Sequence, residues 1–315
     1  MERVEVWTKY LSRPKVDFMD KARIVAPKTD FRWLWIALLS LATIIISFNL
    51  GKQTNIAKNS LGVKKVGIVE ITGPIISSKK IIEDLNQLEQ KENIASIVIR
   101  IDSPGGSVAP TEEIYEKIKK VKKIKPVIAS VGNVAASGGY YIAVAADSIL
   151  ANKGSILGSI GVIISYPIMK DLFDKVGIDV ETIKSGNLKD SGSFSRNPTP
   201  QDKFFFEKLI LNMYNQFIDV IVKDRMMERN NVLSLADGRV FTGLTSLKLG
   251  LIDELGTFES AIEIAAEMGG ISGKPQIFRN NKKSNIIKDF LSSDLSTKIQ
   301  TTWFEKLPQY RWRME

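Results

Sequence analysis

The sequence predicts an α/β domain of parallel strands with helical crossovers, preceded by one N-terminal transmembrane helix. Two observations lead to this prediction. From Val66 onward, short apolar segments rich in β-branched residues alternate with segments of helical periodicity. An 18-residue segment without any charged residue comes before them. Strands that alternate with helices are typical of parallel sheets with helices on their faces.

The apolar segment covers residues 33–50, and its length is sufficient to span a bilayer. Trp33 and Trp35 stand at one end, where interfacial aromatic residues lie. Because about thirty polar residues precede it and no clean small-residue cleavage site follows, a membrane anchor is favoured over a cleaved signal peptide or a buried core helix. Within about 20 residues of the segment, more basic residues precede it than follow it, which predicts a cytoplasmic segment over 1–32 and an outward-facing C-terminal part. These residues are Arg13, Lys15, Lys21, Arg23, Lys28 and Arg32 before the segment, and Lys52, Lys58, Lys64 and Lys65 after it.

The α/β domain is expected over residues 66–273, after a linker at 51–65 and before a lysine- and asparagine-rich tail at 274–315. Buried strands are expected at 66–73, 94–102 and 126–132, because these segments are apolar on both faces. Shorter strands are expected at 148–153, 161–165 and 179–186. Helices are expected after the first and second strands, from Ser137 to Asp147, and from Lys203 to Met227. A turn, a strand and a last helix over 236–269 close the domain.

The composition excludes several kinds of chemistry. The 315 residues include no cysteine, which rules out disulfides and thiolate nucleophiles, and no histidine, which rules out the most common general base and the usual zinc ligands. The formal net charge is +9, but the one dense basic segment, Lys117–Lys125, has apolar residues at helical spacing. It is interpreted as a solvated helix face, because nucleic-acid binding would also require aromatic residues interleaved with the basic ones.

The segment RIDSPGGSV, Arg100–Val108, joins an expected buried strand to an expected helix. Its two adjacent glycines, Gly105 and Gly106, allow backbone conformations that are closed to other residues. Free backbone N–H groups near the start of a helix form an anion site, for a phosphate or for the oxyanion of a tetrahedral intermediate. The spacing fits neither of the common glycine-rich nucleotide-binding motifs. An ordinary strand-to-helix turn explains the motif equally well.

Ser137 stands in GNVAASGGYY, directly after the next expected strand. Small neighbours indicate either helix packing or space for a ligand. In a parallel sheet, ligands bind at the carboxyl ends of the strands, so Ser137 and the glycine turn are expected at the same edge. The N–H groups of Gly138 and Gly106 are then candidates for an oxyanion hole.

A nucleophilic serine needs a base, and without histidine a desolvated lysine is the best candidate. Lys184 and Lys189 lie in a segment rich in glycine and serine after an expected strand, although either could simply be solvated. Asp190 and Asp147 are alternative bases, but a carboxylate is a poor match for a serine hydroxyl at neutral pH.

Five motifs in the same order resemble the signal peptide peptidase A family, peptidase family S49, in its short single-domain form. They are IDSPGGSV, GNVAASGGYYIA, GSIGVI, IKSGNLKD and ADGRVFTG, within about residues 66–269. The resemblance implies a Clp protease or crotonase-like fold of repeated β-β-α units. It implies Ser137 as nucleophile, Lys189 as general base, Ser159 as the residue that orients the lysine, and Gly106 and Gly138 as oxyanion-hole donors. It also implies a homo-oligomeric ring or dome in which the serine and lysine of one site come from neighbouring copies.

The function expected from this resemblance is a membrane-anchored serine endopeptidase with a Ser-Lys dyad, acting through an acyl-enzyme on signal peptides left in the membrane. The expected location is the bacterial inner membrane, with a single span, a cytoplasmic N-terminus and an extracytoplasmic catalytic domain. Its expected partners are apolar or unfolded peptides, the lipid bilayer and copies of itself, with no nucleic acid, cofactor or metal. Two alternatives are an inactive peptide-binding scaffold of the same fold and a crotonase-like acyl-CoA enzyme.

Overall fold

The computed structural model describes residues 35–47, 63–280 and 309–311 of the chain, which divides into two compact units, 1–61 and 62–315. In the first unit, residues 35–47 form a helix. None of the helices in the described part of the chain is both long and apolar enough to cross a membrane. The expected span at 33–50 and the expected N-terminal segment extend over residues outside the described ranges.

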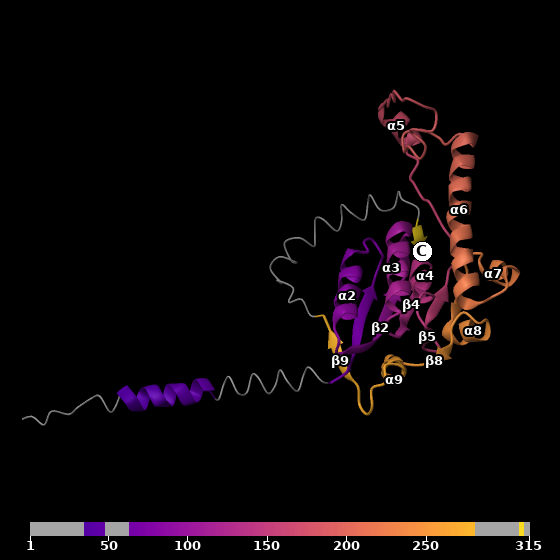
Figure 1. The fold of residues 1–315 in the computed structure, drawn as a ribbon. Helices are drawn as coiled ribbons and strands as arrows, with labels where there is room; N and C mark the ends of the chain where they lie inside the picture. Colours follow the sequence, from indigo (N-terminus) through magenta and orange to yellow (C-terminus); the bar gives the residue numbers. More distant parts are fainter. Residues whose placement is uncertain (1–34, 48–62, 281–308, 312–315) are drawn as a thin grey trace, which may run out of the picture. The chain divides into compact units, whose positions relative to one another are not determined.

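The second unit is built on a mixed, mostly parallel sheet in the order β7-β6-β4-β2-β1-β9, with β5 pairing with β4 and β8 with β5 (Figure 1). Its pairs are parallel except β6 with β7. The strands are β1 (Lys65–Thr72), β2 (Ile94–Ser103), β4 (Val127–Ala136), β5 (Ser148–Ala151), β6 (Ile156–Gly158), β7 (Val240–Thr242), β8 (Glu254–Leu255) and β9 (Gln276–Arg279). A separate two-stranded pair joins β3 (Gly105–Ser107) to β10 (Gln309–Arg311).

Helices cover both faces of the sheet, which confirms the α/β class. Their bounds are α2 (Lys79–Gln90), α3 (Val108–Val121), α4 (Gly138–Ala143), α5 (Lys170–Val176), α6 (Pro200–Arg225), α7 (Arg229–Leu235), α8 (Gly243–Lys248) and α9 (Phe258–Met268). On β2, Ile97 and Ile99 belong to the cluster formed with α2, α3, α4 and α6, whereas Val98 belongs to the cluster formed with α9. Successive side chains of a strand point to opposite faces, so a strand buried on both faces is apolar throughout. Each fully buried Ile or Val contributes about 1.5–3 kcal/mol.

Residues 161–199, here called the arm, leave the sheet after β6 and lead to α6. The strands expected at 161–165 and 179–186 are wrong: neither segment forms a strand, and α5 is the regular element described there. The physical reason lies in the neighbouring sheet, because both edges of β6 are already paired, with β4 and with β7. At β6, where the arm leaves the sheet, no edge is left unpaired, so the segment 179–186 finds no strand partner there, and Ile183 remains 94% exposed.

Aromatic contacts hold the arm together and join it to α6. The ring centroids of Phe173 and Phe194 lie 5.8 Å apart, and those of Tyr166 and Phe206 on α6 lie 5.5 Å apart. The N–H of Met169 donates a 2.6 Å hydrogen bond to the carbonyl of Phe194. Figure 1 shows α5 at the amino end of α6, beyond the sheet and its covering helices. The remaining elements of this unit, 65–160 and 200–279, are called the body.

Candidate active site

The carboxyl ends of β2 and β4 lie side by side, and the candidate site forms there. The two strands are parallel, and Ser103 at the end of β2 pairs with Ala135 near the end of β4. The chain continues from β2 through Pro104 into β3, and from β4 into Ser137. The structure therefore brings Ser137 and the glycine turn to the same edge of the sheet, as the sequence predicts.

Ser137 has an unusual backbone conformation, with φ of 52° and ψ of −114°. Non-glycine residues rarely have positive φ, and such a conformation costs on the order of 1–3 kcal/mol. Two hydrogen bonds hold it: the Ser137 N–H donates to Gly158 at 2.7 Å, and the Ser137 carbonyl accepts from the Tyr141 N–H at 2.9 Å. This sharp turn from strand to helix has the form used to present serine nucleophiles. The hydroxyl donates a long bond of 3.4 Å to the Gly161 carbonyl, and the residue is 1% exposed.

Gly106 and Gly138 are adjacent, and both positions leave little room for a side chain. A Cβ on Gly106 would lie 2.1 Å from the Ile75 carbonyl oxygen, so no side chain fits there. A Cβ on Gly138 would lie 3.3 Å from the Gly106 nitrogen and 2.9 Å from Thr111 Oγ1. Gly138 is the first residue of α4, where N–H groups have no intrahelical acceptor. Two backbone amides thus lie next to each other beside Ser137, which is the arrangement an oxyanion hole needs.

Ser159 lies just after β6, also with a positive φ, of 49°. Its N–H donates to the Arg239 carbonyl at 2.8 Å, and the residue is 7% exposed. It opens onto a largely apolar cavity of about 460 Å³. The lining residues are Ser159, Ile160, Gly161, Val162, Ile163, Ile210, Leu211, Tyr214, Ala236, Asp237 and Gly238. Since Gly161 also accepts the Ser137 hydroxyl, this cavity adjoins the nucleophile.

The structure does not bring Lys189 to Ser137. Lys189 lies in the arm and is exposed, whereas Ser137 is buried in the body. Within the described part of the chain, the Lys189 ammonium forms no hydrogen bond or ion pair with Ser137 or with any other residue. Its backbone N–H donates to Gly186 at 3.1 Å, in a turn. One chain therefore presents the serine and the two amides as a unit, and the lysine apart from them.

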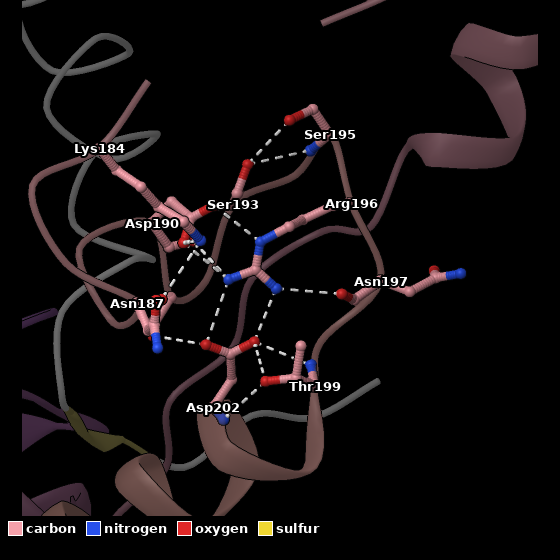
Figure 2. A network of polar contacts seen from close by, with 10 residues as sticks. Lys184, Asn187, Asp190, Ser193, Ser195, Arg196, Asn197, Thr199 and Asp202 are labelled. Atoms are coloured by element: carbon pink, nitrogen blue, oxygen red, sulfur yellow. Dashed lines mark hydrogen bonds and ion pairs between the residues drawn. The ribbon is translucent and has the colours of Figure 1, made fainter. Parts of the chain in front are cut away.

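The loop that carries Lys189 is fixed by a network of charges centred on Arg196 (Figure 2). Arg196 binds the Asp190 carboxylate through Nε at 2.8 Å and Nη2 at 2.9 Å, and the Asp202 carboxylate through Nη1 at 2.6 Å. Lys184 adds a 2.7 Å ion pair to Asp190. Asp202 also forms the capping box of α6 with Thr199. Lys189 precedes Asp190 directly, so this network sets where its backbone lies.

The same network affects which side chain of the arm is suited to act as the general base. The hydrogen bond from Arg196 holds the pKa of Asp190 well below its usual range, with a further contribution from Lys184. Arg196, followed by Ser191, lowers the pKa of Asp202 in the same way. A carboxylate held ionised in this way is a poor proton acceptor at neutral pH. Lys184 is tied to Asp190, which leaves Lys189 as the lysine of this segment without a partner in the described residues.

Asp147, the other alternative base, lies at the opposite edge of the sheet. Its carboxylate accepts the Val127 N–H at 2.8 Å, where β4 begins. Ser137 follows the far end of the same strand, so the two are separated by about 30 Å along it. Among the described residues, no group of three or more acidic side chains could hold a metal ion.

Sequence reasoning missed Arg196 and Asp202. A partial signal was present in Thr199-Pro200-Gln201-Asp202, because a Thr followed by Pro and by an acid at the third position is typical of a helix start. That pattern predicts the cap of α6. It does not reveal that Asp202 also binds Arg196, because this contact depends on how the arm folds back.

Comparisons with known proteins show which proteins this chain resembles. The model of peptidase family S49 matches residues 119–272, and that of Clp protease matches residues 55–154. The chain is 42% identical over 210 residues to "Putative protease slr0021" of Synechocystis sp., covering 66% of this chain and 76% of the relative. It is 30% identical to "Putative signal peptide peptidase SppA" of Enterococcus faecium, covering 74% of this chain and 79% of the relative. It is 31% identical to "Protease 4" of Haemophilus influenzae, covering 65% of this chain and 35% of the relative.

Proposed function

The chain belongs to peptidase family S49 and is a serine protease, and from this premise we propose that it cleaves peptide bonds with Ser137 as nucleophile and Lys189 as base. The observation that carries the proposal is the strained Ser137 beside the adjacent amides of Gly106 and Gly138. Among the described residues, Ser137 and Ser159 are the serines with positive φ, and of these two Ser137 is the one directly followed by Gly138, whose position adjoins the Gly106 nitrogen.

The reaction follows from these groups. The neutral amine of Lys189 takes the proton of the Ser137 hydroxyl as Oγ attacks the peptide carbonyl carbon. The Gly106 and Gly138 N–H groups donate to the oxyanion, whose charge the start of α4 also stabilises. The lysine then gives its proton to the leaving amine as the peptide C–N bond breaks, leaving an acyl group on Ser137. The same lysine, now neutral, removes a proton from water as the water oxygen attacks the ester carbonyl carbon. It returns this proton to Ser137 Oγ as the ester C–O bond breaks, which releases the acid and restores the free hydroxyl.

We further propose that the lysine comes from a second copy of the chain. The cavity beside Ser159 would receive it, because apolar walls favour the neutral amine over the charged ammonium. Asp237 lines this cavity, but Arg239 engages its carboxylate and lowers its pKa to about 2. In this arrangement the Ser159 hydroxyl hydrogen-bonds the incoming amine and orients it.

The exposed surface of the arm supports association of copies. Large apolar side chains there are unusually exposed, and contiguous exposed apolar surface marks interaction sites. The most exposed are Ile168, Leu172, Val176, Ile178, Val180 and Ile183, with Phe204 and Leu211 on α6. A head-to-tail contact made by such an arm closes into a ring when the rotation between copies is regular. A ring or dome of subunits is the assembly we propose.

The membrane setting and the substrates are part of the same proposal. Residues 33–50 anchor the chain in the bacterial inner membrane, with residues 1–32 cytoplasmic and the catalytic domain outside. The substrates are signal peptides left in the membrane, which are apolar and extended. Support comes from the uncharged segment itself and from a relative that carries the name signal peptide peptidase.

A serine-directed fluorophosphonate probe tests the dyad. We expect the parent chain to be labelled at Ser137 and to hydrolyse an apolar reporter peptide. Lys189→Ala should lose both activities by about 10³-fold or more, while the matched control Lys184→Ala should keep at least a tenth of them. Labelling at another serine, or full activity in Lys189→Ala, would refute the dyad. Failure of the parent to react at all would favour the inactive scaffold.

The assembly is tested by placing a charge on the arm. Ile183→Asp should shift the protein to smaller species in light scattering and lower its activity in proportion. Ile124→Asp is the matched control, because Ile124 is an exposed isoleucine of the body, 64% accessible. If the assembly of Ile183→Asp has the mass of the parent assembly, or if Ile124→Asp shows an equal loss of mass, the exposed apolar surface of the arm is no longer evidence for the ring.

A further inference from the structure

We propose that Ser103 is a positioning residue for the oxyanion hole: its buried hydroxyl fixes the glycine turn so that the Gly106 N–H points toward the oxyanion. This inference rests on the proposed function and deepens it, since it assigns a role in the same site to a residue outside the nucleophile, the base and the two donors. Ser103 is the last residue of β2, is 0% exposed, and pairs with Ala135 of β4, close before Ser137.

The Ser103 hydroxyl both donates and accepts a hydrogen bond. Ser103 Oγ donates to the Gly73 carbonyl at 2.7 Å and accepts from the Gly105 N–H at 3.1 Å. A serine hydroxyl has a single O–H to donate, so these two partners fix its direction. Gly73 belongs to the segment that follows β1, and Gly105 belongs to β3. One side chain therefore ties the glycine turn to the neighbouring connection.

The direction of the Gly106 N–H depends on two successive peptide planes. The Gly105 carbonyl and the Gly106 N–H belong to one plane, and in a trans peptide they point in opposite directions. Because the Gly105 carbonyl accepts from the Ile75 N–H at 2.9 Å, the Gly106 N–H is directed away from Ile75. The preceding plane carries the Gly105 N–H, which Ser103 holds. The two planes meet at the Cα of Gly105, where φ is 96°.

The junction between these planes is a glycine, and it needs such a constraint. Glycine adopts positive and negative φ with similar ease, so the backbone of Gly105 alone does not select one conformation. Pro104 fixes its own φ but not the torsions of Gly105. Without the bond to Ser103 the first plane can rotate, and the Gly106 amide loses part of its fixed direction. A donor that must reorient during the reaction stabilises the oxyanion less than one held in advance.

Ser103 also contacts the supports of both donors. Gly73, whose carbonyl the Ser103 hydroxyl holds, lies two residues before Ile75, the residue that fixes the second plane. The backbone of Ser103 packs against α4, because a Cβ on Gly139 would lie 2.8 Å from the Ser103 carbonyl oxygen. Gly139 follows Gly138, the other donor. The loss of the Ser103 hydroxyl should therefore be felt at the oxyanion hole.

Steady-state kinetics of Ser103→Ala test the positioning role. We expect kcat and kcat/KM for an apolar reporter peptide to fall together about tenfold with KM unchanged, as when an interaction made in the transition state weakens. Ser96→Ala is the matched control, because Ser96 is also a fully buried serine of β2, and among the described residues its hydroxyl has no hydrogen-bond partner. Its constants should equal those of the parent. Parent-like kcat in Ser103→Ala, or an equal loss in Ser96→Ala, would overturn the inference.

Ser103→Cys separates hydrogen bonding from packing. A thiol fills the space of the hydroxyl but donates and accepts only weakly. We expect kcat of this variant to be lowered nearly as much as that of Ser103→Ala. If Ser103→Cys has the kcat of the parent, occupied volume and not hydrogen bonding holds the turn, and the proposed role of the hydroxyl is wrong.

Inhibition by a peptide aldehyde measures the oxyanion hole itself. Ser137 Oγ adds to the aldehyde carbon, the carbonyl oxygen takes the electron pair of the C=O π bond, and the serine proton passes to the Lys189 amine. In Ser103→Ala the inhibition constant should rise about tenfold, in step with the fall of kcat. Anisotropy of a fluorescent reporter peptide should give the same affinity for Ser137→Ala with and without Ser103→Ala. Unchanged aldehyde inhibition, or a tenfold loss of peptide affinity, would contradict a role limited to the oxyanion.

Hydrogen exchange separates this inference from the proposed function, because it needs no catalysis. Exchange over residues 103–108 should be faster in Ser103→Ala than in the parent and unchanged in Ser96→Ala. If the parent neither hydrolyses the reporter nor reacts with the fluorophosphonate probe while this exchange pattern is found, the protease mechanism fails and the tie of the glycine turn stands. If the parent hydrolyses the reporter and Ser103→Ala has the constants and the exchange of the parent, the mechanism stands and the role of Ser103 fails.

Discussion

Ser137 and Lys189 lie in two regions of very different construction. Ser137 is in the body, at the end of a strand buried on both faces, with its backbone held by hydrogen bonds to Gly158 and Tyr141. Lys189 is in the arm, where α5 has no buried residue and most large apolar side chains are exposed. The body is held by burial of apolar surface, and the arm by aromatic pairs and by the charges around Arg196.

The difference indicates what each region requires to work. The body holds the proposed nucleophile and both proposed oxyanion donors, and contacts within the body fix their backbone. The arm holds one lysine in a fixed turn and leaves apolar surface uncovered. Exposed apolar surface of this kind marks interaction sites, which is the physical reason for the proposal that the lysine of one chain enters the site of the next.

The largest effect is expected from Gly106→Ala in the body. A Cβ there would lie 2.1 Å from the Ile75 carbonyl oxygen, so β3 must move and take its amide out of the oxyanion hole. We expect kcat to fall by about 10²-fold or more, as when an oxyanion donor is lost. Gly154→Ala is the matched control, since nothing lies within 4 Å of the position its Cβ would take. Its kcat, measured by steady-state kinetics, should equal that of the parent. Parent-like kcat in Gly106→Ala would show that this edge is not the reaction site.

A smaller effect is expected from Arg196→Ala in the arm. It removes the group that joins Asp190 to Asp202 and so loosens the turn that carries Lys189. We expect kcat to fall about tenfold with KM unchanged, because the base is misplaced while peptide binding is not affected. Arg196→Lys should recover part of the loss. The control Arg229→Ala breaks an exposed ion pair with Asp219 and should change neither constant. Equal losses in both alanine variants would mean that Arg196 has no positioning role.

The smallest effect is expected in the pH dependence of the stability of the arm. Arg196 lowers the folded-state pKa of Asp190 and of Asp202 below the unfolded value, which is about 3.9. Their contribution to stability is therefore fully present above that value and is lost as the pH falls through the folded-state pKa. Hydrogen exchange of residues 184–202, corrected for intrinsic rates, should show constant protection from neutral pH to about pH 5 and a decline only in more acidic solution. In Arg196→Ala the decline should begin at higher pH, and an identical profile would contradict the assigned cause.

How much the sequence predicts differs between the same two regions. The strands β1, β2 and β4 are rich in buried apolar residues, so their sequence pattern identifies them, and the parallel order then brings Ser137 and Gly106 together. In the arm, the alternation in 179–186 predicts a strand that does not form. A segment forms a strand only where a neighbouring strand has an unpaired edge. The sequence does not reveal that β7 already pairs with the second edge of β6.

Two sets of contacts were also beyond prediction. The residues of Gln309–Arg311 have no alternating apolar pattern that predicts a strand, and their pairing with β3 depends on which edges the body leaves open. The bridge from Arg196 to Asp190 and Asp202 depends on the fold of the arm, since each of these residues is also plausible as a solvated surface charge. Local patterns thus predict elements, whereas pairing and bridging depend on the assembled fold.

The central claim is that the serine and lysine of one site come from different chains, and complementation tests it most directly. Ser137→Ala and Lys189→Ala are co-expressed, so that both inactive chains enter the same assembly, and peptide hydrolysis is measured. If the sites lie between copies, about a quarter of them combine an intact serine with an intact lysine, and the mixed assembly should recover about a quarter of the parent activity. If each site draws both residues from one chain, every site in the mixture is defective, and activity no higher than that of the two variants alone would contradict the account.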